Sequence, residues 1–85
     1  MKIAGNNYSV LNKSLKDMKG KTAFTNFNTQ EIWLCNSFTE HQTKVALFQE
    51  SLNIINQHYN LDLNTRQVTS LTYALAAFIE DNTQQ

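Results

Sequence analysis

The sequence predicts an α+β domain, in which a small antiparallel sheet of two hairpins packs on two C-terminal antiparallel helices. Apolar and polar residues alternate in the first third of the chain, as they do in half-buried strands. In the second half, apolar residues recur every three or four positions, as they do on one face of a helix. Strands followed by helices are typical of the α+β class. The length of 85 residues suits one domain, residues 1–85.

Two hairpins are predicted in the first part of the chain. Residues 2–11 contain a Gly-Asn-Asn turn between two short strands, because glycine and asparagine tolerate a positive φ. Residues 22–35 form the second hairpin, which ends in a strand rich in β-favouring residues. Side chains alternate along a strand, so Ile32 and Leu34 should face the core and Trp33 and Cys35 the opposite side.

Two helices are predicted, at residues 40–58 and 65–81. Thr39 and Gln42 match a capping box, in which each side chain satisfies a backbone N–H group at the start of the first helix. Asn64 is a suitable N-cap for the second helix. The apolar stripes are Val45, Phe48, Leu52, Ile55 and Tyr59 in the first helix, and Val68, Leu71, Leu75, Phe78 and Ile79 in the second. Since the link is short, the helices should lie side by side, each presenting its stripe to the other and to the hairpins.

The charge of the chain is zero overall but unevenly divided. Residues 1–21 carry five lysines against one aspartate, a net charge of +4, whereas residues 22–85 carry two basic against six acidic residues, a net charge of −4. Overall neutrality argues against a protein that holds nucleic acid by counterion release.

The basic segment, residues 13–21, has four lysines but no arginine and no interleaved aromatic residue, and these are the usual carriers of nucleic-acid contacts. It suits an acidic protein surface better, because complementary charge speeds association. The candidate protein-binding residues are Lys13, Lys16, Lys19, Lys21 and Trp33. Weak nucleic-acid binding by this segment stays open as an alternative.

The single cysteine, Cys35, excludes an internal disulfide framework and a multi-cysteine metal site. No apolar run approaches the 18 residues of a membrane span, and the N-terminus carries no pattern of a secretory signal. These observations predict a cytoplasmic location and no membrane partner.

Five runs of the chain read IAGNNYSV at 3–10, QEIWL at 30–34, VALFQESLNII at 45–55, YNLDL at 59–63 and VTSLTYALAAFIEDN at 68–82. Taken in order, they resemble the small phage-borne zincin-like metallopeptidases that are related to the ImmA/IrrE group. The resemblance implies a truncated zincin-like fold, a phage or prophage origin, and the cytoplasm of a bacterial host as the setting.

The resemblance fails at the residues that would carry the chemistry. The HExxH motif of the family puts two imidazoles on one helical face to bind Zn²⁺, with the glutamate as general base. Here the motif is degenerate, with Gln49, Glu50 and Asn53 at the three positions. Amide oxygens bind zinc poorly, so no catalytic residue, metal or cofactor is predicted. Two interpretations of the three residues stay open: they are the remnant of a metal site, or they lie on the solvent-exposed face of an amphipathic helix.

The sequence therefore predicts a noncatalytic protein, a pseudoenzyme, that binds a host protein of unknown identity, as anti-CRISPR and other inhibitors of bacterial defence do. One alternative is a metal-dependent peptidase with unorthodox ligands and Glu50 as general base, completed across a dimer. His41 and His58 lie about 25 Å apart on one helix and cannot share a metal within one molecule. Small domains often gain stability by association, so a homodimer is also compatible with the sequence.

Overall fold

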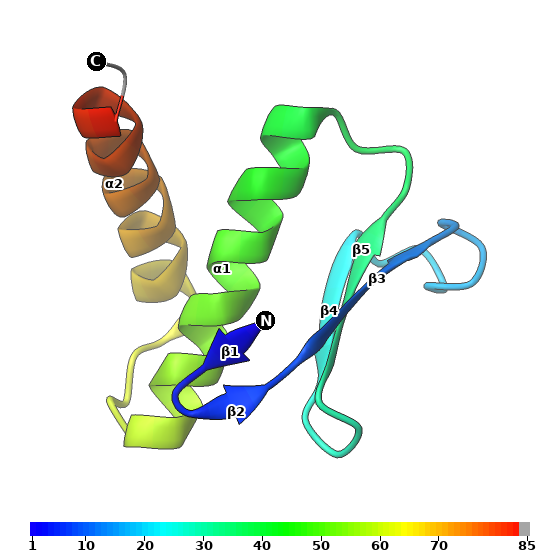
Figure 1. Ribbon diagram of the computed structural model, residues 1–85, viewed down its shortest axis with the longest axis horizontal. Helices are drawn as coiled ribbons and strands as arrows, with labels where there is room; N and C mark the ends of the chain where they lie inside the picture. Colours follow the sequence, from blue (N-terminus) through cyan, green and yellow to red (C-terminus); the bar gives the residue numbers. More distant parts are fainter. Residues whose placement is uncertain (84–85) are drawn as a thin grey trace.

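The structure, a computed structural model, describes residues 1–83 and has the predicted α+β class. It is built in three layers, with a three-stranded sheet on one side, α1 in the middle and α2 beyond it (Figure 1). The elements are β1 (Lys2–Ile3), β2 (Asn6–Asn7), β3 (Ser9–Lys13), β4 (Ala23–Asn26), β5 (Glu31–Cys35), α1 (Glu40–Tyr59) and α2 (Thr65–Thr83).

The sheet differs from the prediction in the partner of one strand. β4 and β5 form the antiparallel hairpin predicted within residues 22–35. The hairpin predicted at residues 2–11 is shorter and its turn is one step earlier: Ala4 and Gly5 form the turn, and Asn6–Asn7, predicted in the turn, form β2 and pair with β1. β3 pairs instead in parallel with β5. The three-stranded sheet is therefore mixed, in the order β3-β5-β4, and not antiparallel throughout.

Tyr8 separates the small hairpin from the sheet. Its side chain is buried, its N–H donates to the carbonyl of Met1 at 2.7 Å, and its own carbonyl accepts from the N-terminal ammonium group at 2.9 Å. Beyond this point β3 runs along β5, so that Leu11 lies opposite Trp33. Alternation in the sequence predicts that residues 9–13 form a strand, but it does not say which strand they join.

The core lies between the sheet and α1. Ile32 and Leu34 of the central strand are almost completely buried, which confirms their predicted orientation. The buried cluster consists of Ile3, Tyr8, Ile32, Leu34 and Ile54. Trp33 faces the other side of the sheet, also as predicted, and is half-buried there.

The predicted starts of both helices are confirmed, while α1 and α2 extend to Tyr59 and Thr83, one and two residues beyond their predicted ends. Thr39 and Gln42 make both bonds of the capping box, at 3.1 and 2.9 Å, and fix the start of α1. Asn60 ends α1 in the left-handed conformation, with a φ of 52°. Asn64 and Gln67 exchange the same pair of bonds before α2, at 2.8 and 2.9 Å.

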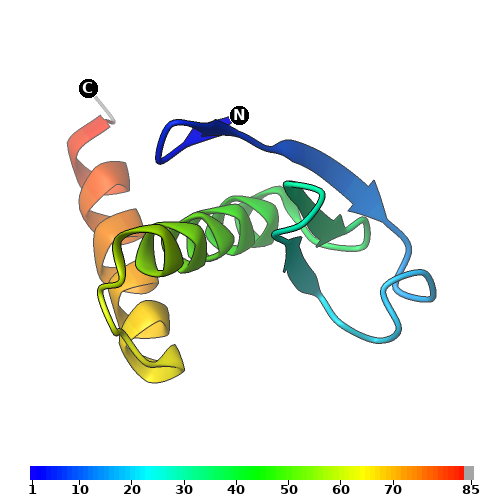
Figure 2. The ribbon, with the colours of Figure 1, turned by 90° about the horizontal axis from the view of Figure 1, so that it is seen from below.

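The prediction that α2 packs on α1 is confirmed, but the prediction that its apolar stripe also faces the hairpins is wrong. Within residues 1–83, α2 packs on α1 and on no strand, and only Val68 and Thr72 of α2 are buried. The helices run in opposite directions in Figure 1 but cross steeply in Figure 2, so they meet near the link and then separate. Phe78 and Ile79, near the far end of α2, are consequently 63% and 46% exposed.

Among residues 1–83, none of the helices combines the length and the apolar character that crossing a bilayer requires.

The link between the helices depends on Asn56, and this gives a testable prediction. The Asn56 side chain donates to the carbonyl of Leu63 and accepts from its N–H, both at 3.0 Å. Replacement Asn56→Ala removes both bonds and should lower the free energy of unfolding by about 1–3 kcal/mol, measured by chemical denaturation. Its exposed neighbour provides the control, since Gln57→Ala should change that free energy by less than about 0.5 kcal/mol. Equal effects of the two substitutions would contradict this role.

Candidate functional site

Glu50 is a buried carboxylate that joins α1 to β4, one of the two edge strands of the sheet. Its side chain is oriented toward β4, and the residue is only 8% exposed. The Thr25 hydroxyl donates to Oε1 of Glu50 at 2.8 Å, and Thr25 itself is 9% exposed. The Asn53 amide donates a longer bond, of 3.4 Å, to Oε2. Oε1 therefore joins the helix to the sheet, whereas Oε2 is bonded within the helix.

This geometry corrects one of the two interpretations of the degenerate motif. Glu50 does not lie on a wet helix face, because that part of α1 faces the sheet. Gln49 and Asn53 are half-buried on either side of it. They line two separate hollows beside β4, of about 400 and 440 Å³, and Glu50 borders both.

The donor set at these positions does not fit a zinc ion. Zinc sites in proteins use imidazole, thiolate and carboxylate ligands, whereas Gln49 and Asn53 offer neutral amide oxygens. Across residues 1–83, no group of three or more His, Cys, Asp and Glu side chains is placed to hold a metal ion. His41 and His58 are both exposed and lie near opposite ends of α1.

A second candidate site lies on the face of the sheet that α1 does not cover. Phe24 of β4 and Trp33 of β5 meet edge to face, with ring centroids 5.7 Å apart. The Lys13 Nζ lies 4.9 Å from the centroid of the Trp33 ring, and the Lys21 Nζ lies 5.1 Å from that of Phe24. Both distances are those of cation–π contacts. We name these four residues the lysine–aromatic face.

The loop between β3 and β4 completes this face. Met18, which is 4% exposed, is the buried apolar residue of this loop. The turn closes at Lys19 and Gly20, both at positive φ, and the Gly20 N–H donates to the carbonyl of Leu15 at 3.1 Å. A hollow of about 370 Å³ results, lined by Asp17, Met18, Lys19, Lys21, Phe24 and Trp33.

The structure thus brings most of the predicted protein-binding residues together. Lys19, Lys21 and Trp33 line one hollow, and Lys13 lies over the Trp33 ring at its side. Lys16 is exposed and does not line the hollow.

Of the two aromatic residues of this face, the sequence predicted Trp33 as a protein-binding residue but not Phe24. Neither ring lies within the lysine-rich segment 13–21, because Phe24 and Trp33 come from later strands that the pairing of β4 with β5 brings together. The register of the β4–β5 hairpin, which places Phe24 opposite Trp33, was the available signal for that pair. The parallel pairing that adds Lys13 has no counterpart in the local pattern.

The lysines of this face have no acidic partner in the part of the chain that the structure describes. The ion pair found there joins Lys44 to Glu40 at 3.8 Å, on the exposed side of α1. The positive charge of the lysine–aromatic face is therefore not neutralised by a carboxylate within 4.0 Å.

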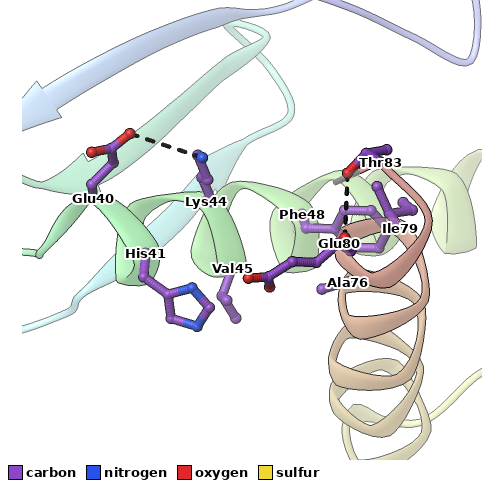
Figure 3. Close-up of a pocket in the computed structure, with 9 residues that line it drawn as sticks. All are labelled: Glu40, His41, Lys44, Val45, Phe48, Ala76, Ile79, Glu80 and Thr83. Atoms are coloured by element: carbon purple, nitrogen blue, oxygen red, sulfur yellow. Dashed lines mark hydrogen bonds and ion pairs between the residues drawn. The ribbon is translucent and has the colours of Figure 1, made fainter. Parts of the chain in front are cut away.

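A groove also opens where α1 and α2 separate (Figure 3). It has a volume of about 670 Å³ and lies between the first half of α1 and the last turns of α2. Val45, Phe48, Ala76 and Ile79 supply its apolar lining, and the His41 ring and Glu80 carboxylate extend into the open space beside Val45.

Comparisons with protein-family models, with curated proteins and with solved structures find no match to this chain. The resemblance to the zincin-like metallopeptidases stays a prediction from the sequence runs given above.

The position of Glu50 predicts a structural role that substitution can test. Glu50→Ala leaves the buried Thr25 hydroxyl without its acceptor and should lower the free energy of unfolding by about 1–3 kcal/mol, measured by chemical denaturation. Glu50→Gln should cost less, because the amide oxygen still accepts a hydrogen bond. Glu80→Gln, on an exposed part of α2, is the control and should stay within about 0.5 kcal/mol of the unmodified chain. If Glu50→Ala were as stable as the control, the carboxylate would not support the fold.

Proposed function

We propose that this chain is a noncatalytic binding protein, which acts by attaching to another protein. The observation that carries the proposal is the hydrogen bond between Thr25 and Glu50. A general base must reach the proton that it abstracts, directly or through one water molecule. Here Glu50, the carboxylate of the degenerate motif, borders two hollows but is only 8% exposed, and one of its oxygens already accepts the Thr25 hydroxyl.

Two exposed surfaces support binding as the function. The lysine–aromatic face combines positive charge that has no carboxylate partner with two large aromatic rings, the residue types that dominate protein contacts. On the other side of the molecule, α2 leaves large apolar side chains exposed. Apolar surface that is gathered on one element is typical of interaction sites.

The biological setting is part of the same proposal and rests on the resemblance of residues 20–82 to phage-borne zincin-like proteins. In that setting the partner is a protein in the cytoplasm of a bacterial host, and inhibition of a bacterial defence system, as by anti-CRISPR proteins, is the activity that we propose.

Capture from cell lysates tests the proposal. Tagged full-length chain, incubated with lysates of several bacterial hosts, should retain one partner in stoichiometric amount, identified and quantified by mass spectrometry. The tag alone is the control. Failure to retain any protein from all the lysates would contradict a binding function.

A catalytic function would give a different result. Protein purified without chelators would then contain close to one zinc ion per chain and would cleave peptides, and Glu50→Gln would abolish the cleavage. That outcome would overturn the proposal in favour of a metallopeptidase with unorthodox ligands.

A further inference from the structure

We propose that the lysine–aromatic face is the docking site for an acidic segment of the partner protein, one that carries a large apolar side chain among its carboxylates. This inference rests on the proposed binding function and adds the chemistry of the partner and the surface that recognises it.

Charge complementarity is the first argument. Lys19 and Lys21 line the hollow and Lys13 lies over the ring of Trp33, which also lines it; among residues 1–83 none of these lysines has a carboxylate within 4.0 Å. Asp17 also lines the hollow, and the Glu31 carboxylate accepts from the Trp33 indole, so three lysines lie near two carboxylates and the local charge stays positive. Carboxylates of a partner would supply the counter-charges and would accelerate encounter at low salt.

The aromatic rings hold two of the ammonium groups in place. Lys13 lies over Trp33, and Lys21 lies over Phe24, at distances typical of cation–π attraction. The Trp33 ring is itself fixed, because its indole N–H donates to Oε1 of Glu31 at 3.2 Å. Lysine side chains that are already ordered lose less conformational entropy when a carboxylate binds them.

The hollow beside the lysines explains why the acidic segment should carry an apolar side chain. Met18, Phe24 and Trp33 provide its apolar lining. Its volume of about 370 Å³ falls in the lower part of the range of small ligand sites, about 300–1,000 Å³. A leucine or phenylalanine side chain placed there would be desolvated against Met18 and the edges of the paired rings, an apolar environment of the kind in which interface anchors are found.

Single-stranded nucleic acid fits this face less well. Proteins that bind single strands present open ring faces on which bases stack, whereas here ammonium groups lie over both rings. The face contains no arginine, and the net charge of −4 on residues 22–85 would repel a phosphate backbone that continued past it.

A second copy of the chain fits less well for a geometric reason. The end of α2 carries Glu80 and Asp81 beside the exposed Phe78, which is an acidic segment with an apolar residue. However, α2 and the sheet are the two outer layers of the molecule, on opposite sides of α1 (Figure 1). Contacts between these two different surfaces would join copies head to tail, an arrangement that tends to continue into filaments.

Selection from a random peptide display library tests the inference. The full chain is immobilised and the recovered peptides are sequenced. They should be enriched in aspartate and glutamate around at least one large apolar residue. Binding of each peptide is then measured through the emission of Trp33, the single tryptophan of the chain, which lies in the proposed site.

Substitution of lysines supplies the site-specific readout. Lys13→Gln and Lys21→Gln should each weaken peptide binding about twofold to fivefold, as expected for single exposed ion pairs, and together about tenfold. Lys44→Gln, on the exposed side of α1, is the matched control and should leave the affinity unchanged. All variants should keep the melting temperature of the unmodified chain, which separates loss of contact from loss of fold.

Four outcomes would overturn the inference. Recovery of no peptide, or of peptides without acidic enrichment, would contradict the proposal that the partner segment is acidic. Acidic peptides that bind equally well to the Lys13→Gln and Lys21→Gln variants would leave the proposed binding function standing but would place it on another surface. If oligothymidylate bound as tightly as the peptides, the ligand of this face would be a nucleic acid and not an acidic protein segment. If the chain associated with itself and Glu80→Gln abolished that association, the occupant of this face would be a second copy of the chain.

Discussion

The hydrogen bond from Thr25 to Glu50 joins β4 to the central helix α1. The orientation of β4, and with it the position of the lysine–aromatic face, depends on this contact. Thr25 faces the helix, so its neighbour Phe24 must face the other side of the sheet, because side chains alternate along a strand. There Phe24 meets Trp33 and, with it, the lysines. One buried polar contact thus both engages the carboxylate of the degenerate motif and orients the strand that builds the lysine–aromatic face.

Local features of the fold could be predicted from the sequence because they depend on residues close together in the chain. Thr39 and Gln42 form their capping box three residues apart, and Asn60 ends α1 through its own left-handed conformation. Ile32 and Leu34 face the core because alternation is a property of a single strand. The hairpin of β4 and β5 is likewise local, since a short turn connects the two strands.

The parts that the sequence did not predict depend on distant partners. The parallel pairing of β3 with β5 brings Leu11 opposite Trp33 across a loop and another strand, and no local pattern distinguishes it from a longer first hairpin. The burial of Glu50 depends on Thr25, which lies 25 residues away. The apolar stripe of α2 predicted a buried helix, but helical periodicity does not determine the angle at which two helices cross.

The central claim is that Glu50 and Thr25 stabilise the fold as a pair, and a double-mutant cycle tests it most directly. Thr25→Val, Glu50→Ala and the double variant, in which each single substitution removes the hydrogen bond, are compared with the unmodified chain by chemical denaturation. A coupling free energy of at least about 0.5 kcal/mol, within the range measured for residues in direct contact, is the predicted result. Additive effects of the two substitutions, with a coupling near zero, would contradict it.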